Sequence, residues 1–157
     1  MDQFQEFVVT RSYCKWIEEL QRRESWDECV NRYYDYFGER FPELLGEEWD
    51  AIRQSTIKRE VFPSMRALMT AGAAAEVDDT CLYNCSYLPV NSISSFSDIL
   101  YILCCGTGVG FSCESIETNQ LPIIPEINRN EKIIIDVDDS RRGWADSFND
   151  LLSALYG

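Results

Sequence analysis

The 157-residue sequence contains no histidine and no Cys-x-x-Cys pair. Cysteine and histidine at such short spacings are the usual ligands of structural zinc. A zinc site here would need thiolates alone at unusual spacing, so we expect no metal site. The seven cysteines are therefore interpreted as free thiols or as members of a redox pair.

The sequence also lacks an excess of positive charge and a long apolar run. It has 14 basic and 27 acidic residues, a net charge of −13, and such a field repels nucleic acid and anionic lipid. No apolar stretch approaches the roughly 20 residues that span a bilayer, and the N-terminal MDQFQEF lacks the features of an export signal. We expect a cytoplasmic protein that binds neither nucleic acid directly nor membranes.

Two common nucleotide-binding motifs are absent as well. The Gly-Lys-Ser/Thr of a P-loop does not occur. The GTGVG at residues 106–110 is not Gly-x-Gly-x-x-Gly, and it follows an expected helix and precedes an expected strand, the reverse of a dinucleotide-binding loop. As a pattern alone, it favours a tight turn over a ligand cradle.

The first half of the chain is predicted to be helical. Apolar residues recur at helical spacing over residues 11–23, 25–40 and 47–59. Ser25 and Glu28 form a capping box that starts the second helix, and Pro42 ends it. A short helix is then expected, with Ser64 at its N-cap and Gly72 at its C-cap.

Four cysteines fall where packing is the favoured role of a thiol. Cys14 and Cys29 lie on the apolar faces of predicted helices, and Cys104 and Cys105 are adjacent at the end of another. Buried thiols behave as small hydrophobic groups. We expect all four to pack in the core.

The second half of the chain alternates strands and helices. Strands are predicted over residues 81–88, 111–116 and 132–137, and helices over residues 95–105 and 143–155. Strand alternation places Cys81, Tyr83, Cys85 and Tyr87 on one face. Cys81 and Cys85 would then lie about 13 Å apart, too far for a disulfide. Helices followed by alternating strands and helices predict an α/β fold with a helical N-terminal region.

Five strings, in this order and spacing, resemble the N-terminal part of a ribonucleotide reductase large chain, in particular the adenosylcobalamin-dependent (class II) ribonucleoside-triphosphate type. They are PSMRALMTAG, YNCSYLPV, YILCCGTGVGFS, LPIIP and DSRRGWADSFNDLLSALYG. The resemblance extends over residues 11–157, and the joint occurrence of the strings is more specific than any one of them.

The resemblance implies a ten-stranded α/β barrel, of which this chain would hold only the beginning. We expect a helical N-terminal region over residues 1–75 and the first part of the barrel over residues 76–157, with effector-region segments at residues 113–139. Three or four strands do not close such a barrel. The chain is therefore expected to be either a truncated large chain or the N-terminal piece of a split reductase.

The resemblance also implies roles for individual residues. Cys85 corresponds to one of the two cysteines that reduce the substrate and become a disulfide. Ser64 resembles the hydroxyl residue that contacts the substrate, Asn84 lies beside the cysteine, and Gly108 lies in the loop that approaches the nucleotide.

The remaining parts of the reaction are expected from outside this chain. The resemblance implies a complementary C-terminal reductase chain that carries the second reducing cysteine, the thiyl-radical cysteine and the adenosylcobalamin site. It also implies a ribonucleotide substrate, a dNTP or ATP effector and a thioredoxin-type reductant. A different class of function is a non-catalytic, reductase-derived module that binds nucleotide or a reductase partner. The intact Cys85 and GTGVG favour the enzyme.

Overall fold

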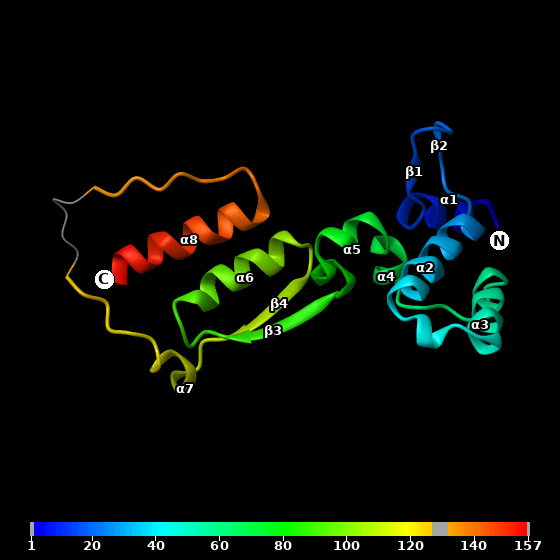
Figure 1. The fold of residues 1–157 in the computed structure, drawn as a ribbon. Helices are drawn as coiled ribbons and strands as arrows, with labels where there is room; N and C mark the ends of the chain where they lie inside the picture. Colours follow the sequence, from blue (N-terminus) through cyan, green and yellow to red (C-terminus); the bar gives the residue numbers. More distant parts are fainter. Residues whose placement is uncertain (1, 127–131, 157) are drawn as a thin grey trace. The chain divides into compact units, whose positions relative to one another are not determined.

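The computed structural model describes residues 2–126 and 132–156, in two compact units, Met1–Tyr83 and Asn84–Gly157 (Figure 1). Within the described residues, no helix combines the length and the hydrophobicity that crossing a bilayer requires. The predicted domain boundary after residue 75 stays a prediction.

The first unit is mainly helical, and side-chain caps start several of its helices, among them α1 and α2. Asp2 accepts a hydrogen bond from the Gln5 amide at 2.8 Å and starts α1. Ser25 accepts one from the Glu28 amide at 3.2 Å and starts α2, as the capping box predicted. The elements are α1 (Gln3–Ser12), β1 (Trp16–Ile17), β2 (Arg22–Arg23), α2 (Trp26–Arg40), η1 (Pro42–Leu44), α3 (Glu47–Ile57), α4 (Met65–Thr70), α5 (Ala73–Val77) and η2 (Asp79–Leu82).

The helices predicted over residues 25–40 and 47–59 are confirmed as α2 and α3, and α2 ends before Pro42. Residues 11–23 do not form the predicted helix. α1 ends at Ser12, and β1 pairs with β2 in an antiparallel hairpin. Trp16 and Leu20, which suggested the helix, are 52% and 55% exposed.

The buried carboxylate of Glu24 explains why this segment forms a hairpin. The Lys15 amide donates to Glu24 Oε2 at 2.9 Å, and the Glu24 amide donates to the Lys15 carbonyl at 2.8 Å. These bonds tie the two ends of the hairpin together. The hydrogen bonds to the buried Glu24 carboxylate stabilise the hairpin. A helix here would be favoured only by the apolar periodicity, and the apolar side chains concerned stay exposed.

Two buried clusters stabilise the first unit. The larger consists of Cys14, Trp26, Cys29, Val30, Tyr34 and Leu68, and the smaller of Tyr36, Ala71, Ala75 and Cys81. Cys14 and Cys29 are 2% and 0% exposed, so their predicted packing role is confirmed. Burial raises the pKa of the Cys29 thiol to about 12, so this thiol stays protonated well above neutral pH.

The second unit is built on a strand–helix–strand arrangement. β3 (Cys85–Pro89) and β4 (Gly108–Ser112) are parallel, and α6 (Ser94–Cys104) connects them. α7 (Ser115–Thr118) and α8 (Arg141–Tyr156) follow, and α8 packs against α6 (Figure 1). The helices predicted over residues 95–105 and 143–155 are thus confirmed as α6 and α8.

Both central strands are displaced from their predicted positions. β3 begins at Cys85 and not at Cys81, because residues 79–82 form η2, in which Asp78 Oδ1 accepts from the Thr80 amide at 2.9 Å. Cys81 is therefore buried and does not share a strand face with Cys85. β4 begins at Gly108, so the glycine segment is mostly strand. The predicted turn there is limited to Gly106, at φ 83°.

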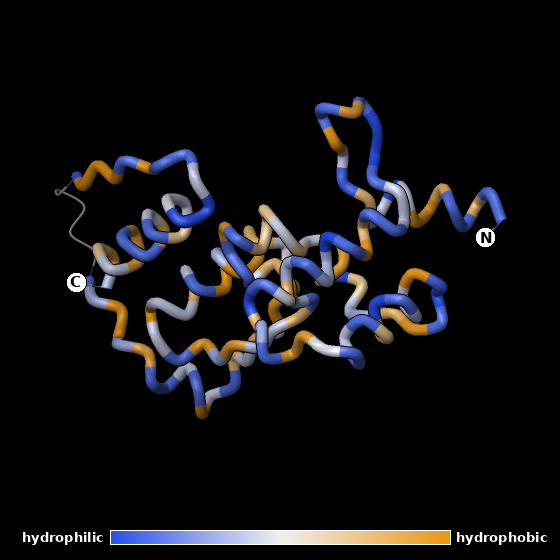
Figure 2. Tube along the Cα trace, turned by 45° about the vertical axis from the view of Figure 1, so that its right-hand side comes forward, coloured by the Kyte–Doolittle hydropathy of each residue, from blue (hydrophilic) through white to orange (hydrophobic). Residues whose placement is uncertain are grey.

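The strand predicted over residues 132–137 is wrong. Residues 132–138 are described and form no strand; Ile133 and Ile134 are 65% and 89% exposed. Hydrophobic positions are visible in this extended stretch before α8 (Figure 2). A strand needs a neighbour that pairs with its backbone. Residues 127–131 of the expected effector region lie outside the described residues.

The fold class is confirmed as a helix-rich mixture of helices and small sheets. The described residues form two two-stranded sheets, one antiparallel and one parallel. A ten-stranded barrel is not formed by these residues, and it stays a prediction about the complete enzyme.

Candidate functional site

The parallel pair β3–β4 presents one bare face. Cys85 lies opposite Gly108 and Tyr87 opposite Gly110, and partners in a parallel pair point to the same side. All four residues are exposed. The other face is covered by α6, where Phe111 helps to line an apolar cavity of about 310 Å³. The exposed face therefore carries a thiol, a tyrosine ring and two glycines.

Gly108 and Gly110 leave open space beside Cys85. A Cβ added at Gly108 would lie 3.5 Å from the Asn84 carbonyl oxygen, and one at Gly110 would lie 3.8 Å from the Ser86 carbonyl oxygen, both ordinary contacts. Neither backbone conformation requires glycine. Glycine weakens a strand and often marks a place where another group approaches the backbone closely. The geometry therefore fits a ligand surface next to the thiol.

Cys85 is one of three exposed thiols. Cys104 and Cys113 are also exposed, whereas Cys81 and Cys105 are buried. The predicted packing role is thus confirmed for Cys105 and wrong for Cys104. Exposure alone does not distinguish Cys85 from Cys104 and Cys113. Cys85 differs from them because it lies on the exposed sheet face, opposite Gly108.

The structure brings Asn84, Cys85 and Gly108 together. The Gly108 amide donates to the Asn84 carbonyl at 2.9 Å, which aligns the start of β4 with the start of β3. Asn84 is exposed and directly precedes Cys85 in the chain. Sequence reasoning did not assign a role to Tyr87 or Gly110, although strand alternation had already placed Tyr87 on the face of Cys85.

Ser64 lies in the first unit, at the N-cap of α4. Its Oγ accepts from the Ala67 amide at 3.3 Å, so the predicted cap is confirmed. A serine hydroxyl that accepts a hydrogen bond still has its own proton to donate, and the residue is exposed. α4 ends at Thr70 with Ala71 as C-cap, one residue before the predicted Gly72, which has φ 88°.

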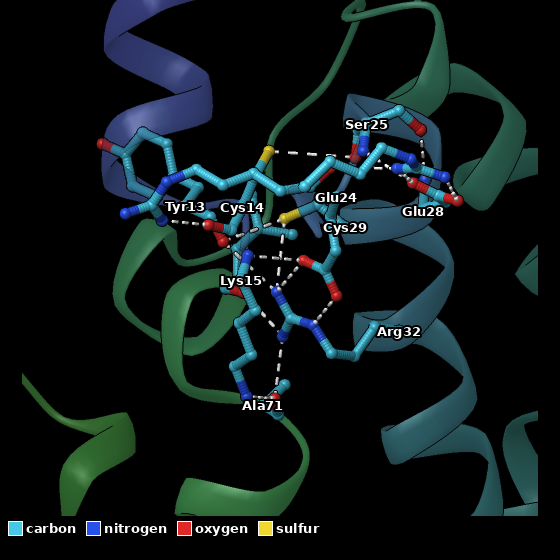
Figure 3. A network of polar contacts seen from close by, with 12 residues as sticks. Tyr13, Cys14, Lys15, Glu24, Ser25, Glu28, Cys29, Arg32 and Ala71 are labelled. Atoms are coloured by element: carbon cyan, nitrogen blue, oxygen red, sulfur yellow. Dashed lines mark hydrogen bonds and ion pairs between the residues drawn. The ribbon is translucent and has the colours of Figure 1, made fainter. Parts of the chain in front are cut away.

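A buried charged network surrounds the C-terminal end of α4 (Figure 3). Arg32 pairs with Glu24, with Nε 2.7 Å from Oε1. Arg32 Nη1 donates to the Ala71 carbonyl at 2.7 Å, and Lys15 Nζ donates to the same carbonyl at 2.6 Å. Burial, with the neighbouring Arg32 charge, lowers the pKa of Lys15. These long-range pairs gave no signal in the sequence, because their partners are brought together only by the fold.

Comparison with known proteins finds one family model and one solved structure similar to parts of this chain. Residues 1–71 match the family model of the ribonucleotide reductase alpha domain. A crystal structure of a B-12 dependent (class II) ribonucleotide reductase shares the fold, with a TM-score of 0.68 and 18% identity over 96% of this chain. This chain spans 31% of that protein. No curated protein matches the sequence. The family match includes Ser64 and stops before Cys85.

Proposed function

We propose that this chain, an N-terminal part of a ribonucleotide reductase large chain, supplies one of the two thiols that reduce the substrate in a complete reductase. That thiol is Cys85. The observation that carries the proposal is its exposure on a sheet face whose opposite position is the bare backbone of Gly108. A reducing thiol must touch its substrate, and this face leaves room for one.

The reaction is the replacement of the ribose 2′ hydroxyl by hydrogen. A thiyl radical in the remainder of the enzyme abstracts the 3′ hydrogen and later returns a hydrogen to that carbon. The 2′ hydroxyl takes a proton and leaves as water. Cys85 and a second cysteine supply two electrons and two protons and become a disulfide. The sum is ribonucleotide plus two thiols giving deoxyribonucleotide, water and one disulfide.

The resemblance implies that the partner thiol of Cys85 comes from outside this chain. Within the chain, Cys85 forms no disulfide, and Cys81 is buried with Tyr36, Ala71 and Ala75. We propose that a complementary C-terminal part of the reductase provides the second cysteine. A thioredoxin-type dithiol then reduces the pair for the next turnover. Free cysteines throughout the chain suit a reducing compartment, and we place the enzyme in the cytoplasm.

Ser64, Asn84 and Gly108 are proposed to orient the ribonucleotide. Ser64 has an exposed hydroxyl with a proton to donate, and the exposed Asn84 directly precedes the reducing cysteine in the chain. Gly108 allows the nucleotide to approach the backbone. A dNTP or ATP effector is proposed to bind near residues 113–139 and to select the substrate base.

Adenosylcobalamin is proposed as the source of the radical, by likeness to the B-12 dependent reductase. The residues of this chain do not fit it: the sequence has no histidine, the commonest metal ligand, and the site face offers only a thiol, a tyrosine and backbone. We assign the cofactor to the remainder of the enzyme, and no role of this chain's residues depends on it.

The test is turnover by the reductase assembled from this chain and its complementary part. Cys85→Ser should abolish multiple-turnover reduction while assembly and nucleotide binding remain, because serine keeps the shape and loses the redox chemistry. Cys104→Ser is the matched control, since Cys104 is also exposed but lies at the end of α6. Thioredoxin should be the reductant, so that no small thiol bypasses the pair.

Full turnover by the Cys85→Ser enzyme would contradict the assignment. The second candidate function, a non-catalytic module that binds nucleotide or a reductase partner, predicts something else. In that case the wild-type chain would bind its partner, and neither Cys85→Ser nor Cys104→Ser would change any measured reduction rate.

A further inference from the structure

α4 is too short to define its own position. It has six residues, Met65–Thr70, and isolated helices of that length are unstable in water. Contacts with the rest of the first unit must therefore place it. Its C-terminal end is held by Arg32 and Lys15, which both donate to the Ala71 carbonyl. Ser64 is at the opposite end.

The first turn of α4 has its own anchor, in Arg66. Arg66 Nε donates to the Cys81 carbonyl in η2 at 2.9 Å. η2 is itself held firmly, because Asp78 caps it and the Cys81 side chain packs with Ala71 and Ala75. The bond therefore joins the turn that carries Ser64 to the segment that leads, four residues later, into Cys85.

We infer that Arg66 is a positioning residue, which holds the Ser64 hydroxyl in place for nucleotide binding. The inference rests on the proposed function of Ser64. Ser64 is only two residues from Arg66 and is exposed, and its cap bond to Ala67 is long at 3.3 Å. Without the Arg66 bond, the first turn loses its link to η2, and the hydroxyl is less well oriented.

Three substitutions separate the hydrogen bond from the charge. In Arg66→Gln the amide nitrogen occupies the place of Nε, so a donor remains without the charge. In Arg66→Lys the charge remains, but a carbon occupies that place. In Arg66→Met both are lost, and the side chain keeps similar bulk. Positioning through Nε predicts that glutamine restores most of the function and that lysine does not.

The experiment measures the Kd and KM of the assembled reductase for the four ribonucleoside triphosphates. Arg66→Met and Arg66→Lys should raise both by about 10-fold, the effect of one well-formed hydrogen bond, with kcat changed less. Ser64→Ala should have a similar effect. If Arg66 acts through Ser64, Arg66→Met should add almost nothing in the Ser64→Ala background.

Each outcome decides the inference. Equal effects of glutamine and methionine, or additive effects of Arg66→Met and Ser64→Ala, would overturn it. So would an unchanged Kd in Arg66→Met. The proposed function fails separately: it is contradicted if Cys85→Ser keeps full turnover, whatever the Arg66 variants do. An assembly that binds no nucleotide would contradict both.

Discussion

Removal of Arg32 should strongly destabilise the first unit. Its side chain and that of Glu24 are 16% and 9% exposed, and each guanidinium nitrogen donates: Nε and Nη2 to Glu24, Nη1 to the Leu68 and Ala71 carbonyls. In Arg32→Met the buried Glu24 carboxylate no longer has its ion-pair partner. The Ala71 carbonyl at the end of α4 also loses its hydrogen bond from Arg32. Breaking one side of a buried pair costs about 3–5 kcal/mol.

The control is Arg53→Met, which removes a similar pair at the surface. Arg53 Nη1 lies 2.9 Å from Asp35 Oδ1, and the Asp35 side chain is 59% exposed. Solvent screens such a pair, so its loss should cost less than about 1 kcal/mol. Glu24→Gln combined with Arg32→Met should be less destabilising than the sum of the single changes by about 2 kcal/mol, since both remove the same interaction.

The assay is urea unfolding followed by tryptophan fluorescence. A Trp144→Phe background restricts the signal to the first unit, because Trp16, Trp26 and Trp49 all lie there. If Arg32→Met is no more destabilising than Arg53→Met, the network of Arg32, Glu24 and Lys15 does not anchor α4.

The remaining predictions concern stability. Tyr36 Oη is the buried side-chain oxygen without a hydrogen-bond partner among the described residues, so Tyr36→Phe should leave the unfolding free energy unchanged or raise it slightly. Tyr34→Phe should lower it by about 1–2 kcal/mol in the same urea assay, because Tyr34 Oη and Thr56 Oγ1 share a buried bond of 2.8 Å; equal losses would contradict this. Stability should also fall as pH rises above about 9, because the Cys29 pKa is raised from 9.0 to about 12 by burial and the unfolded chain releases its thiol proton first. Cys29→Ala should show a shallower decline between pH 9 and 11, and an unchanged slope would show that Cys29 does not titrate this way.

Local signals in the sequence were sufficient for the long helices. The Ser25–Glu28 capping box, the broad apolar stripe that follows and Pro42 together define α2, and similar periodicity defines α3, α6 and α8. Each of these signals acts within a few residues, so it operates in any fold that the chain adopts. The five strings likewise indicated a resemblance to ribonucleotide reductases, and the alpha-domain model of that family matches residues 1–71.

The tertiary structure decided what depends on distant partners. Residues 16–23 form a hairpin because Glu24 is buried against Arg32 and bonded to Lys15. β4 begins at Gly108 because Asn84 offers its carbonyl there, and the isoleucine-rich residues 132–137 form no strand, since a strand requires a pairing neighbour that the described residues do not supply. The sequence determined that Cys85 belongs to a strand. The register between β3 and β4 decided that Cys85 lies opposite Gly108. Local periodicity in the sequence does not predict the register between two strands.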